Sequence, residues 1–440
     1  MNERTDSALL TDLYMLTMLQ GFLEQGMNEV ATYEFFARRL PVERGFLVAA
    51  GLEQALAYLE QARFEPHELD WLAGTNRFSR AFIDHLATWR FAGDVHALPE
   101  GTVCFENEPL IRVSAPIMQA QMVETRIINL LHFQTLIASK AARCVLAAPG
   151  KLLVDFGLRR AHGAEAGLLA ARANYLAGFG GTATVLAGKC YDVPIYGTMA
   201  HSYIQAHERE IDAFESYARA QPGNVVLLID TYDTEAGAEK VVELAPRLAE
   251  RGIKITGVRL DSGDLASHAR KVRRILDEGG LSDTVIFSSG SLDEHALAEL
   301  LRKGAPIDGF GVGTRLDTSA DAPYLDCAYK LVEYAGHPRR KRSEGKATWP
   351  GRKQVYRVYE EREGVRTMRG DTITAEHDTQ PGEPLVRPVM RAGQRLAAPE
   401  PLARARERAL GELASLPAHL RALATEPPYP VHVAPALEAL

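Results

Sequence analysis

The segment GVRLDSGDL, residues 257–265, ends an apolar strand-like run with an arginine, two acids and a serine. Such polar groups are costly to bury unless they meet a ligand, an ion or one another. Arg259 offers a planar guanidinium to a carboxylate or a phosphate, and Asp261 is suited to sugar hydroxyls or to a hydrated Mg²⁺. A ribose with its diol and a pyrophosphate would satisfy this set. The alternative is an internal ion pair between Arg259 and Asp261 without any ligand.

Two further segments place reactive side chains just beyond apolar runs. His201 lies in YGTMAHSY, three residues after Thr198, where a histidine can act as a general base, as a nucleophile toward phosphate, or merely as a helix cap. In VDFGLRRAHG, Arg159 could clamp a diphosphate while Phe156 offers a flat face to an aromatic ring. A surface arginine pair is commonly just solvated, so that reading stays open for Arg159 and its neighbour.

Glycine-rich segments end the last two apolar runs. Ser289 and Gly290 lie in SSGSLD, and Gly313 and Thr314 lie in GFGVGT. Exposed backbone N–H groups at such strand ends bind phosphates, and the loops after the final strands of a barrel are a recurrent phosphate site. Glycines there are turn formers first, so each segment alone is a weak signal. The sequence has no G-x-x-x-x-G-K-[ST], so any ATP would be bound without a P-loop.

The elements that must position these residues follow a repeated strand–helix pattern. The apolar runs are nearly continuous in Val, Ile, Leu and Phe, as expected of parallel strands that are buried on both faces. Segments with helical spacing of apolar residues separate them. Because parallel α/β folds place their sites at the carboxyl ends of the strands, we predict one shared site in an irregular, incomplete (β/α) barrel. The six runs are residues 151–157, 192–198, 224–231, 253–263, 283–290 and 307–314.

The rest of the chain has a different pattern. Residues 1–140 mix helical and strand-like segments and are predicted to form an N-terminal α/β domain. Residues 141–334 are predicted to form the barrel that carries the site. Residues 335–440 begin with a basic, turn-rich run, PRRKRSEGKATWPGRK, and we expect the segment after it to fold back on the N-terminal domain. The basic run is either a phosphate contact or an exposed charged loop.

Composition limits the class of protein. The 440 residues are 46% hydrophobic and 24% charged with no apolar run long enough for a membrane span, which is typical of a soluble globular protein. The net charge of −7 gives no general reason to bind nucleic acid. Acidic residues at positions 3, 6 and 12 argue against a signal peptide, and four widely spaced cysteines fit reduced side chains that pack in the protein. We therefore expect a cytoplasmic protein.

Nine motifs in order carry a resemblance to a known family. They are TDLYMLTM, YEFFARRLP, RGFLVAAGLE, FENEPLIRV, DFGLRRAHG, YGTMAHS, VRLDSGDL, GVGTRL and KATWPGRKQV, which span roughly residues 10 to 360. The chain resembles nicotinate phosphoribosyltransferases. The resemblance implies the type II phosphoribosyltransferase fold, and a homodimer with active sites at the subunit interface. The implied reaction forms nicotinate mononucleotide and pyrophosphate from nicotinate and phosphoribosyl pyrophosphate, coupled to ATP, in NAD salvage.

The same resemblance implies roles for several residues. His201 would be phosphorylated transiently by ATP, and Mg²⁺ would accompany the pyrophosphate. Tyr14 would reach the neighbouring subunit's site and stack on nicotinate opposite Phe156. Met15, beside it, stands where the family often has Gln.

Four more residues would bind the substrates by this resemblance. Thr198 and Arg259 would contact nicotinate, and Gly313 with Thr314 would hold the phosphate end. Together with the residue chemistry above, Asp261 would fix the ribose during transfer, and Arg159 with Mg²⁺ would meet the leaving group.

Three alternatives stay open from the sequence. Nicotinamide phosphoribosyltransferase is similar in motif order but has an acidic residue in a G-T-D-T segment, where this chain has GTAT with Ala183. The missing carboxylate favours nicotinate over the amide. A non-catalytic barrel that binds sugar phosphates is the second alternative. A lyase with a Schiff-base lysine is the third, although no strand end named above presents a lysine.

Overall fold

The computed structural model describes residues 7–343 and 348–440, and they form two compact units. Unit 1 contains the residues up to 139 together with those from 324 onward, and unit 2 contains residues 140–323. Strand β12 (Asp326–Tyr334), which the sequence prediction placed in the barrel segment, pairs with β1 (Val30–Arg39) of unit 1. The acidic residues 3 and 6, which speak against a signal peptide, lie outside the described residues, as do residues 344–347 of the basic run.

Unit 2 is built on one parallel sheet. Its strand order is β7-β6-β11-β10-β9-β8, and in the described part of the chain no pairing between β7 and β8 closes it. This open sheet confirms the predicted α/β class and incomplete barrel. The strands are β6 (Leu152–Asp155), β7 (Gly181–Thr182), β8 (Val226–Leu228), β9 (Gly257–Leu260), β10 (Val285–Ser288) and β11 (Gly309–Val312).

One of the six predicted strands is wrong. Residues 192–198 form no strand, and only Ile195 makes an isolated parallel bridge, to Thr182. The position in the sheet belongs to β7, a short strand that the sequence prediction missed. Proline at 194 removes a donor from the run 192–198, which fits its failure to extend a ladder.

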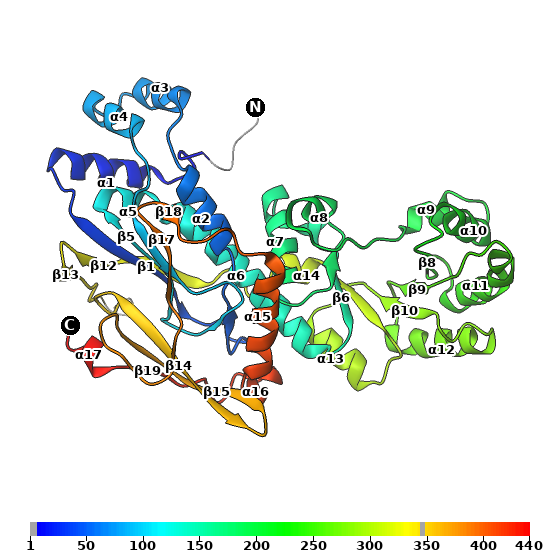
Figure 1. The fold of residues 1–440 in the computed structure, drawn as a ribbon. Coiled ribbons are helices and arrows are strands. Elements are labelled where there is room, and N and C mark those ends of the chain that lie inside the picture. The colour runs from blue at the N-terminus through cyan, green and yellow to red at the C-terminus, as the bar shows by residue number, and fades with distance from the viewer. Residues whose placement is uncertain (1–6, 344–347) are drawn as a thin grey trace. The chain divides into compact units, whose positions relative to one another are not determined.

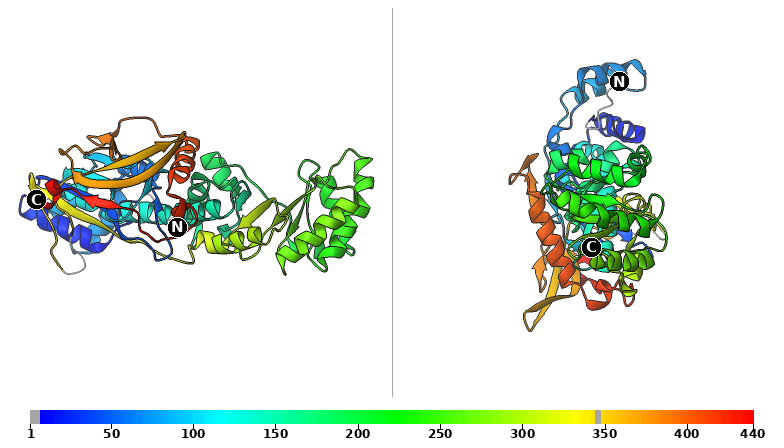
Figure 2. Two further views of the ribbon diagram at one scale, coloured as in Figure 1. Left: turned by 90° about the horizontal axis from the view of Figure 1, so that it is seen from below. Right: turned by 90° about the vertical axis from the view of Figure 1, so that its right-hand side faces the viewer.

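The helices of unit 2 follow the strands and several begin at an aspartate. Asp233, Asp264 and Asp293 each accept a hydrogen bond from a backbone amide three residues later, which caps the helix N-terminus. Figures 1 and 2 show α11 and α12 side by side next to β8–β10. The helices are α7 (Ala164–Leu176), α8 (Val185–Tyr191), α9 (His201–Gln205), α10 (Glu210–Ala220), α11 (Thr234–Ala249), α12 (Leu265–Glu278), α13 (Glu294–Arg302) and α14 (Thr314–Asp317), with a 3-10 turn at Leu158–Arg160.

Unit 1 combines both ends of the chain in its sheets. A seven-stranded sheet has the order β13-β12-β1-β5-β3-β17-β18, so strands from after residue 324 lie at both of its edges. Its remaining strands are β3 (Asp94–Ala97), β5 (Pro109–Pro116), β13 (His337–Pro338), β17 (Arg387–Arg391) and β18 (Gln394–Arg395). The C-terminal segment therefore returns to the N-terminal one.

Two smaller sheets complete unit 1. The long hairpin of β14 (Lys353–Arg362) and β15 (Val365–Ala375), orange in Figures 1 and 2, is flanked by β16 (Glu383–Pro384) and β19 (Val431–Val433). A pair of short strands consists of β2 (Leu47–Val48) and β4 (Val103–Cys104). The helices are α1 (Leu13–Glu24), α2 (Leu52–Gln61), α3 (Pro66–Gly74), α4 (Arg80–Ala87), α5 (Ile117–Met122), α15 (Leu402–Ser415), α16 (Ala418–Arg421) and α17 (Pro435–Glu438), while α6 (Glu124–Ala147) runs past the boundary of the unit.

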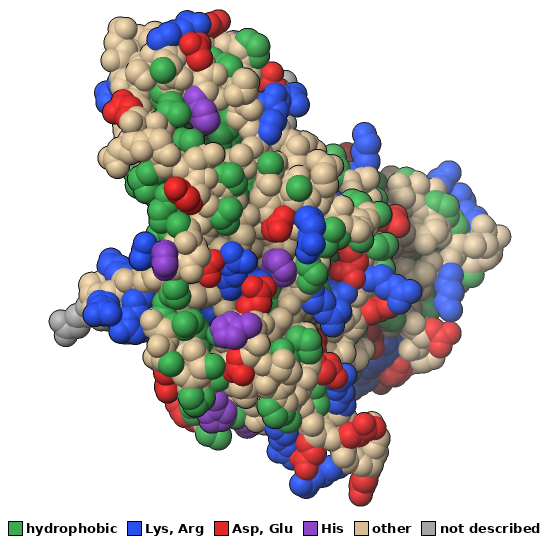
Figure 3. Space-filling model, turned by 60° about the vertical axis from the view of Figure 1, so that its left-hand side comes forward, with side chains coloured by type: hydrophobic (Ala, Val, Ile, Leu, Met, Phe, Trp, Pro, Cys, Tyr) green, Lys and Arg blue, Asp and Glu red, His purple; other side chains and the backbone are tan. Residues whose placement is uncertain are grey.

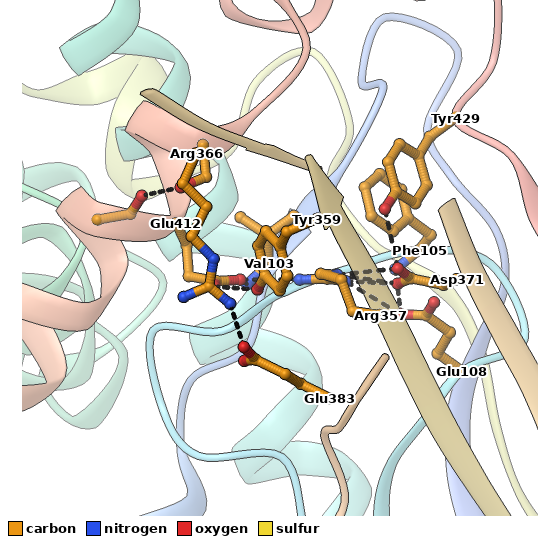
Figure 4. A network of polar contacts seen from close by, with 12 residues as sticks. Val103, Phe105, Glu108, Arg357, Tyr359, Arg366, Asp371, Glu383, Glu412 and Tyr429 are labelled. Carbon is orange, nitrogen blue, oxygen red and sulfur yellow. Dashed lines mark hydrogen bonds and ion pairs between the residues drawn. The ribbon is translucent and has the colours of Figure 1, made fainter. Parts of the chain in front are cut away.

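A buried ionic network ties the C-terminal segment to the N-terminal one (Figure 4). The guanidinium of Arg357, on β14, donates to Asp371 on β15 at 2.6 Å and to Glu412 on α15 at 2.8 Å. Glu108, from the N-terminal segment, lies 4.0 Å from the same guanidinium, and Tyr429 donates to Asp371 at 2.8 Å. Breaking such a network leaves an unpaired buried charge, so it fixes how these segments pack.

Two sequence expectations concern the whole chain. Within the described ranges, no helix is both long and apolar enough to cross a bilayer. All four cysteines are free; Cys104 and Cys144 are buried, whereas Cys190 is exposed rather than packed.

Candidate active site

The parallel register of unit 2 brings the predicted site residues to one edge of its sheet. Asp155, at the end of β6, is paired with Val312, at the end of β11. Ser288 ends β10 beside Leu260, which ends β9. Because parallel strands end at a common edge, Phe156, Gly313, Ser289 and Asp261 follow one another along it.

Asp261 is the most connected of these residues. Its backbone N–H donates to Asp230 Oδ2 at 2.8 Å, and Ser262 Oγ donates to the same oxygen at 2.6 Å. Ser289 Oγ donates to Asp261 Oδ1. Gly290 has φ of +100°, and a Cβ there would collide with the Asp261 carbonyl oxygen, so this turn requires glycine. The loops after β9 and β10 are thus held against each other.

His201 opens α9 and faces this acid. Its Nδ1 lies 3.1 Å from Thr231 Oγ1, and its Nε2 lies 3.9 Å from Asp261 Oδ2. The side chain is 38% exposed, which leaves it open to a ligand. Thr231 occupies Nδ1, in a contact whose donor depends on the tautomer, so Nε2 is the ring nitrogen that faces Asp261.

Arg259 and Thr198 form the next pair along the edge. Arg259 Nη1 donates to Thr198 Oγ1 at 2.7 Å. Burial lowers the pKa of the Arg259 guanidinium; the charge of Arg159 acts in the same direction, while Asp261 and Asp230 raise it. Two cationic groups therefore lie near two carboxylates, which suits a ligand that carries several negative oxygens.

Phe156, which follows β6, forms an aromatic wall near one end of this edge. Its ring packs directly over Gly311, where a Cβ would collide with it, and its centroid lies 5.9 Å from that of Phe287. Its backbone N–H donates to Val312 O at 2.8 Å. Gly313 lies against the Phe156 carbonyl and precedes Thr314, the first residue of α14. The wall and the glycine-rich loop are therefore neighbours.

Tyr14 belongs to unit 1, whereas the other predicted site residues belong to unit 2. It lies on α1 with half of its surface exposed, and its hydroxyl donates to Glu124 Oε1 at 3.5 Å. Partial burial and the charges of Glu124 and Asp12 raise its pKa to about 12, so the phenol is neutral at physiological pH. The Sδ atom of the adjacent Met15 accepts a hydrogen bond from Gln121 Nε2 at 3.3 Å.

The oxygen atoms of the edge fit a weakly held Mg²⁺ better than a structural metal. In residues 7–343 and 348–440, no group of three or more His, Cys, Asp or Glu is arranged to hold a metal ion. Asp230 Oδ1 is buried and finds no hydrogen-bond partner in the described structure, and Asp261 is one-third exposed. Mg²⁺ bound through one or two carboxylates with water and substrate phosphates matches this pair.

Sequence reasoning missed two of the residues that shape the site. Asp230 and Thr231 end the apolar run 224–231, but no role was predicted for either of them. Hydroxyl groups are common after strands, and only the fold brings this one to within hydrogen-bond distance of His201.

Several residues of the basic run line a cavity in unit 1. It has a volume of about 520 Å³ and is lined by cationic side chains and two aromatic rings: Phe36, Asn107, Arg340, Lys341, Arg342, Thr348, Trp349 and Lys353. On the face in Figure 3, Lys and Arg side chains gather on a projecting segment at the left edge and are elsewhere interspersed with Asp and Glu. The lining suits an anionic group.

Comparison with known proteins places these features in a family. The profile of the nicotinate phosphoribosyltransferase N-terminal domain matches residues 9–132, and that of the nicotinate phosphoribosyltransferase family matches residues 152–345. A nicotinate phosphoribosyltransferase of Mycobacterium tuberculosis is 48% identical over 97% of this chain and 91% of its own length. One from Bacillus subtilis is 40% identical over 80% of this chain and 73% of its own length.

Solved structures agree with the sequence comparisons. The crystal structure of human nicotinic acid phosphoribosyltransferase superposes with a TM-score of 0.87 at 29% identity, covering 98% of both chains. A nicotinate-nucleotide pyrophosphorylase from Pyrococcus furiosus gives 0.74 at 25% identity, covering 93% of this chain and 95% of that one. The chain belongs to the nicotinate phosphoribosyltransferase family.

Proposed function

We propose that this chain is a cytoplasmic enzyme of NAD salvage that transfers the phosphoribosyl group of phosphoribosyl pyrophosphate to nicotinate and releases pyrophosphate. The observation that carries the proposal is the convergence of His201, Asp261 and Arg259 at one edge of the unit 2 sheet. Family membership over most of the chain supports the same reaction.

The proposed transfer breaks the bond between ribose C1 and the pyrophosphate oxygen while the ring nitrogen of nicotinate bonds to C1. Positive charge develops on the ribose and negative charge on the leaving group. Asp261 would hold the ribose hydroxyls, and Arg159 would bind the pyrophosphate. Mg²⁺, when bound by Asp230 and Asp261, would neutralise phosphate charge. Phe156 would align the flat ring for attack, with Arg259 and Thr198 on its carboxylate.

ATP coupling would use His201. Thr231 occupies its Nδ1, so Nε2 is the free nucleophile. In the proposed step Nε2 bonds to the γ-phosphorus of ATP, ADP leaves with the electron pair of the broken P–O bond, and water later hydrolyses the phosphohistidine to phosphate. The Gly-rich loops with Ser289, Gly290, Gly313 and Thr314 would bind the phosphates of the substrate.

A homodimer with shared sites is part of the proposal. Large apolar side chains are exposed in both units, which marks surfaces for association. Leu13 and Tyr14 are exposed on α1 of unit 1, and Val185, Leu186 and Ile195 are exposed in unit 2 at 70%, 52% and 56%. Tyr14 of one subunit would complete the ring site of the other.

Nicotinamide is the competing substrate. Ala183 is exposed and its N–H donates to Asp155 O at 2.8 Å, so the position near Phe156 carries no carboxylate to bind an amide or repel an acid. The test is one reaction mixture with both bases at equal concentration and limiting phosphoribosyl pyrophosphate. Nicotinate mononucleotide should dominate the product, by roughly 100-fold or more. Predominant nicotinamide mononucleotide would assign the chain the other substrate, and no pyrophosphate release with either base would overturn the enzymatic proposal.

A further inference from the structure

Two carboxyl groups are buried against each other directly beneath the candidate site. Asp155 is the last residue of β6, and Asp317 is the last residue of α14. Their exposed fractions are 1% and 2%. The two carboxyls are close enough that each shifts the other's ionisation, and Asp317 Oδ2 is buried without a hydrogen-bond partner among the described residues. Two ionised carboxylates repel and cannot hydrogen-bond, so the contact requires one proton on the pair.

The neighbours decide which carboxyl carries that proton. Gly157 N–H donates to Asp155 Oδ1, and Thr182 Oγ1 donates to Asp155 Oδ2, both at 2.7 Å. Asp155 therefore accepts on both oxygens, as an ionised carboxylate does. Asp317 accepts at Oδ1, from Asn174 Nδ2 at 2.9 Å, and none of the described residues donates to its buried Oδ2. Its Oδ2 is left to carry the proton and donate it to Asp155.

The electrostatics agree with this assignment. Burial, followed by the negative charge of Asp155, raises the pKa of Asp317 well above its ordinary value. Burial also raises the pKa of Asp155, but its hydrogen bonds from Thr182 and Gly157 oppose that shift. Both effects favour the proton on Asp317 and the negative charge on Asp155.

The pair connects two loops of the site, the turn after β6 and the turn before α14. Gly157 lies so close to the Asp317 carboxyl that a Cβ would collide with it. The turn after β6 that contains Gly157 also carries Phe156 and Arg159. On the other side, Asp317 N–H donates to Gly313 O at 3.1 Å, within the turn that presents the phosphate-binding glycine. The ring wall and the phosphate loop are joined through these two carboxyls.

We infer that Asp155 and Asp317 are positioning residues, a one-proton carboxyl pair in which Asp317 donates, and that this pair sets the spacing between the nicotinate wall and the phosphate loop. The inference rests on the proposed function for the meaning of that spacing. The same substitution, Asp to Asn, should therefore have different effects at positions 155 and 317. An Asn at 317 can accept from Asn174 and donate to Asp155, whereas an Asn at 155 must turn an NH₂ toward one of two donors.

The test compares Asp155→Asn and Asp317→Asn in the full chain, with hydrogen exchange and steady-state kinetics. Asp155→Asn should speed amide exchange in peptides covering 156–160 and 313–316 and raise KM for nicotinate roughly 10-fold to 100-fold, with a smaller fall in kcat. Asp317→Asn should match the wild type within about threefold in both readouts. Asp317→Ala, which deletes the donor without introducing a misplaced one, should resemble Asp155→Asn and serves if that variant fails to fold.

Glu210→Gln is the matched control. Glu210 is also buried in unit 2, but it pairs with Lys240 at 2.8 Å, between α10 and α11. Its loss should lower the unfolding midpoint without changing exchange in the two loops. Equal behaviour of Asp155→Asn and Asp317→Asn would overturn the inference, as would unchanged loop exchange in both. A wild type that shows no turnover of nicotinate would instead sink the proposed function, while the exchange data still judge the pair.

Discussion

The two ring nitrogens of His201 have different surroundings, so a role in ATP stimulation can be separated from a role in the basal transfer. Nδ1 contacts Thr231, while Nε2 faces Asp261 at 3.9 Å. If His201 serves only to accept a phosphoryl group, then His201→Ala should abolish the stimulation by ATP more completely than the basal transfer measured without ATP. The measurement is pyrophosphate release from nicotinate and phosphoribosyl pyrophosphate with and without ATP. Equal loss of both rates would show that the imidazole also takes part in the transfer itself.

Thr231 should matter through His201 and not by itself. Thr231→Val keeps the side-chain shape but removes the hydroxyl that contacts Nδ1, so the imidazole loses the contact that orients its Nε2. We expect the ATP-stimulated rate to fall about 10-fold while KM for nicotinate stays unchanged. Thr231→Ser, which keeps the hydroxyl, is the control and should retain most of the activity. An unaffected Thr231→Val enzyme would mean that this contact does not orient the imidazole.

At the level of elements, hydrophobic patterning predicted the buried strands of the sheet but not the short strand β7. The runs that became β6, β8, β9, β10 and β11 are apolar because both faces are covered, and the sequence carries that signal directly. The run 192–198 is equally apolar but contains Pro194 and makes only the bridge at Ile195. Strand β7 has two residues, Gly181 and Thr182, and is defined by backbone pairing with β6, which leaves no pattern in the sequence.

The hairpin β14–β15 offers a pH test of the buried network in Figure 4. Burial raises the pKa of Glu108 well above its ordinary value of 4.5. The interaction of Glu108 with the nearby Asp371 carboxyl raises this pKa further. The folded state then keeps a proton that the unfolded chain loses, so this group's stabilising contribution is complete below pH 4.5 and declines as the pH rises toward the folded pKa. Glu108→Gln has no such decline, because the glutamine amide does not titrate in this pH range.

The stability of Glu108→Gln relative to the wild type should therefore increase with pH. The limiting slope is about 1.4 kcal/mol per pH unit for one proton. Urea unfolding at intervals from pH 5 to pH 8 measures it. Glu106→Gln, an exposed neighbour whose oxygen accepts from Leu40 N–H at 2.8 Å, is the control and should show no such trend. A flat difference for Glu108→Gln would mean that Glu108 is ionised in the folded protein.

For the whole molecule, the candidate site residues beside apolar runs could be predicted from the sequence, but the residues that contact them could not. His201, Asp261 and Arg259 each follow or end an apolar run, and such positions are visible without a structure. Asp317 sits in an ordinary DTS tripeptide, and its partner Asp155 is 162 positions earlier in the numbering (317 − 155). Only the parallel pairing of β6 with β11 brings them together. Supporting contacts of this kind depend on tertiary pairing, which local composition does not encode.

The proposed homodimer with shared sites can be tested by mixing inactive chains. Tyr14→Ala should remove the ring-stacking group of the partner's site, and Asp261→Ala should inactivate a chain's own site. If the two variants are unfolded together and refolded at equal amounts, half of the dimers are mixed. Each mixed dimer has one site with both residues intact, so activity should return to about one quarter of the wild-type value.

The double variant Tyr14→Ala/Asp261→Ala mixed with wild type is the control. Its mixed dimers have no intact site, so activity per wild-type chain should fall to about one half. If Tyr14 instead serves its own chain, the two single variants will not complement and the double variant will leave the wild-type activity unchanged.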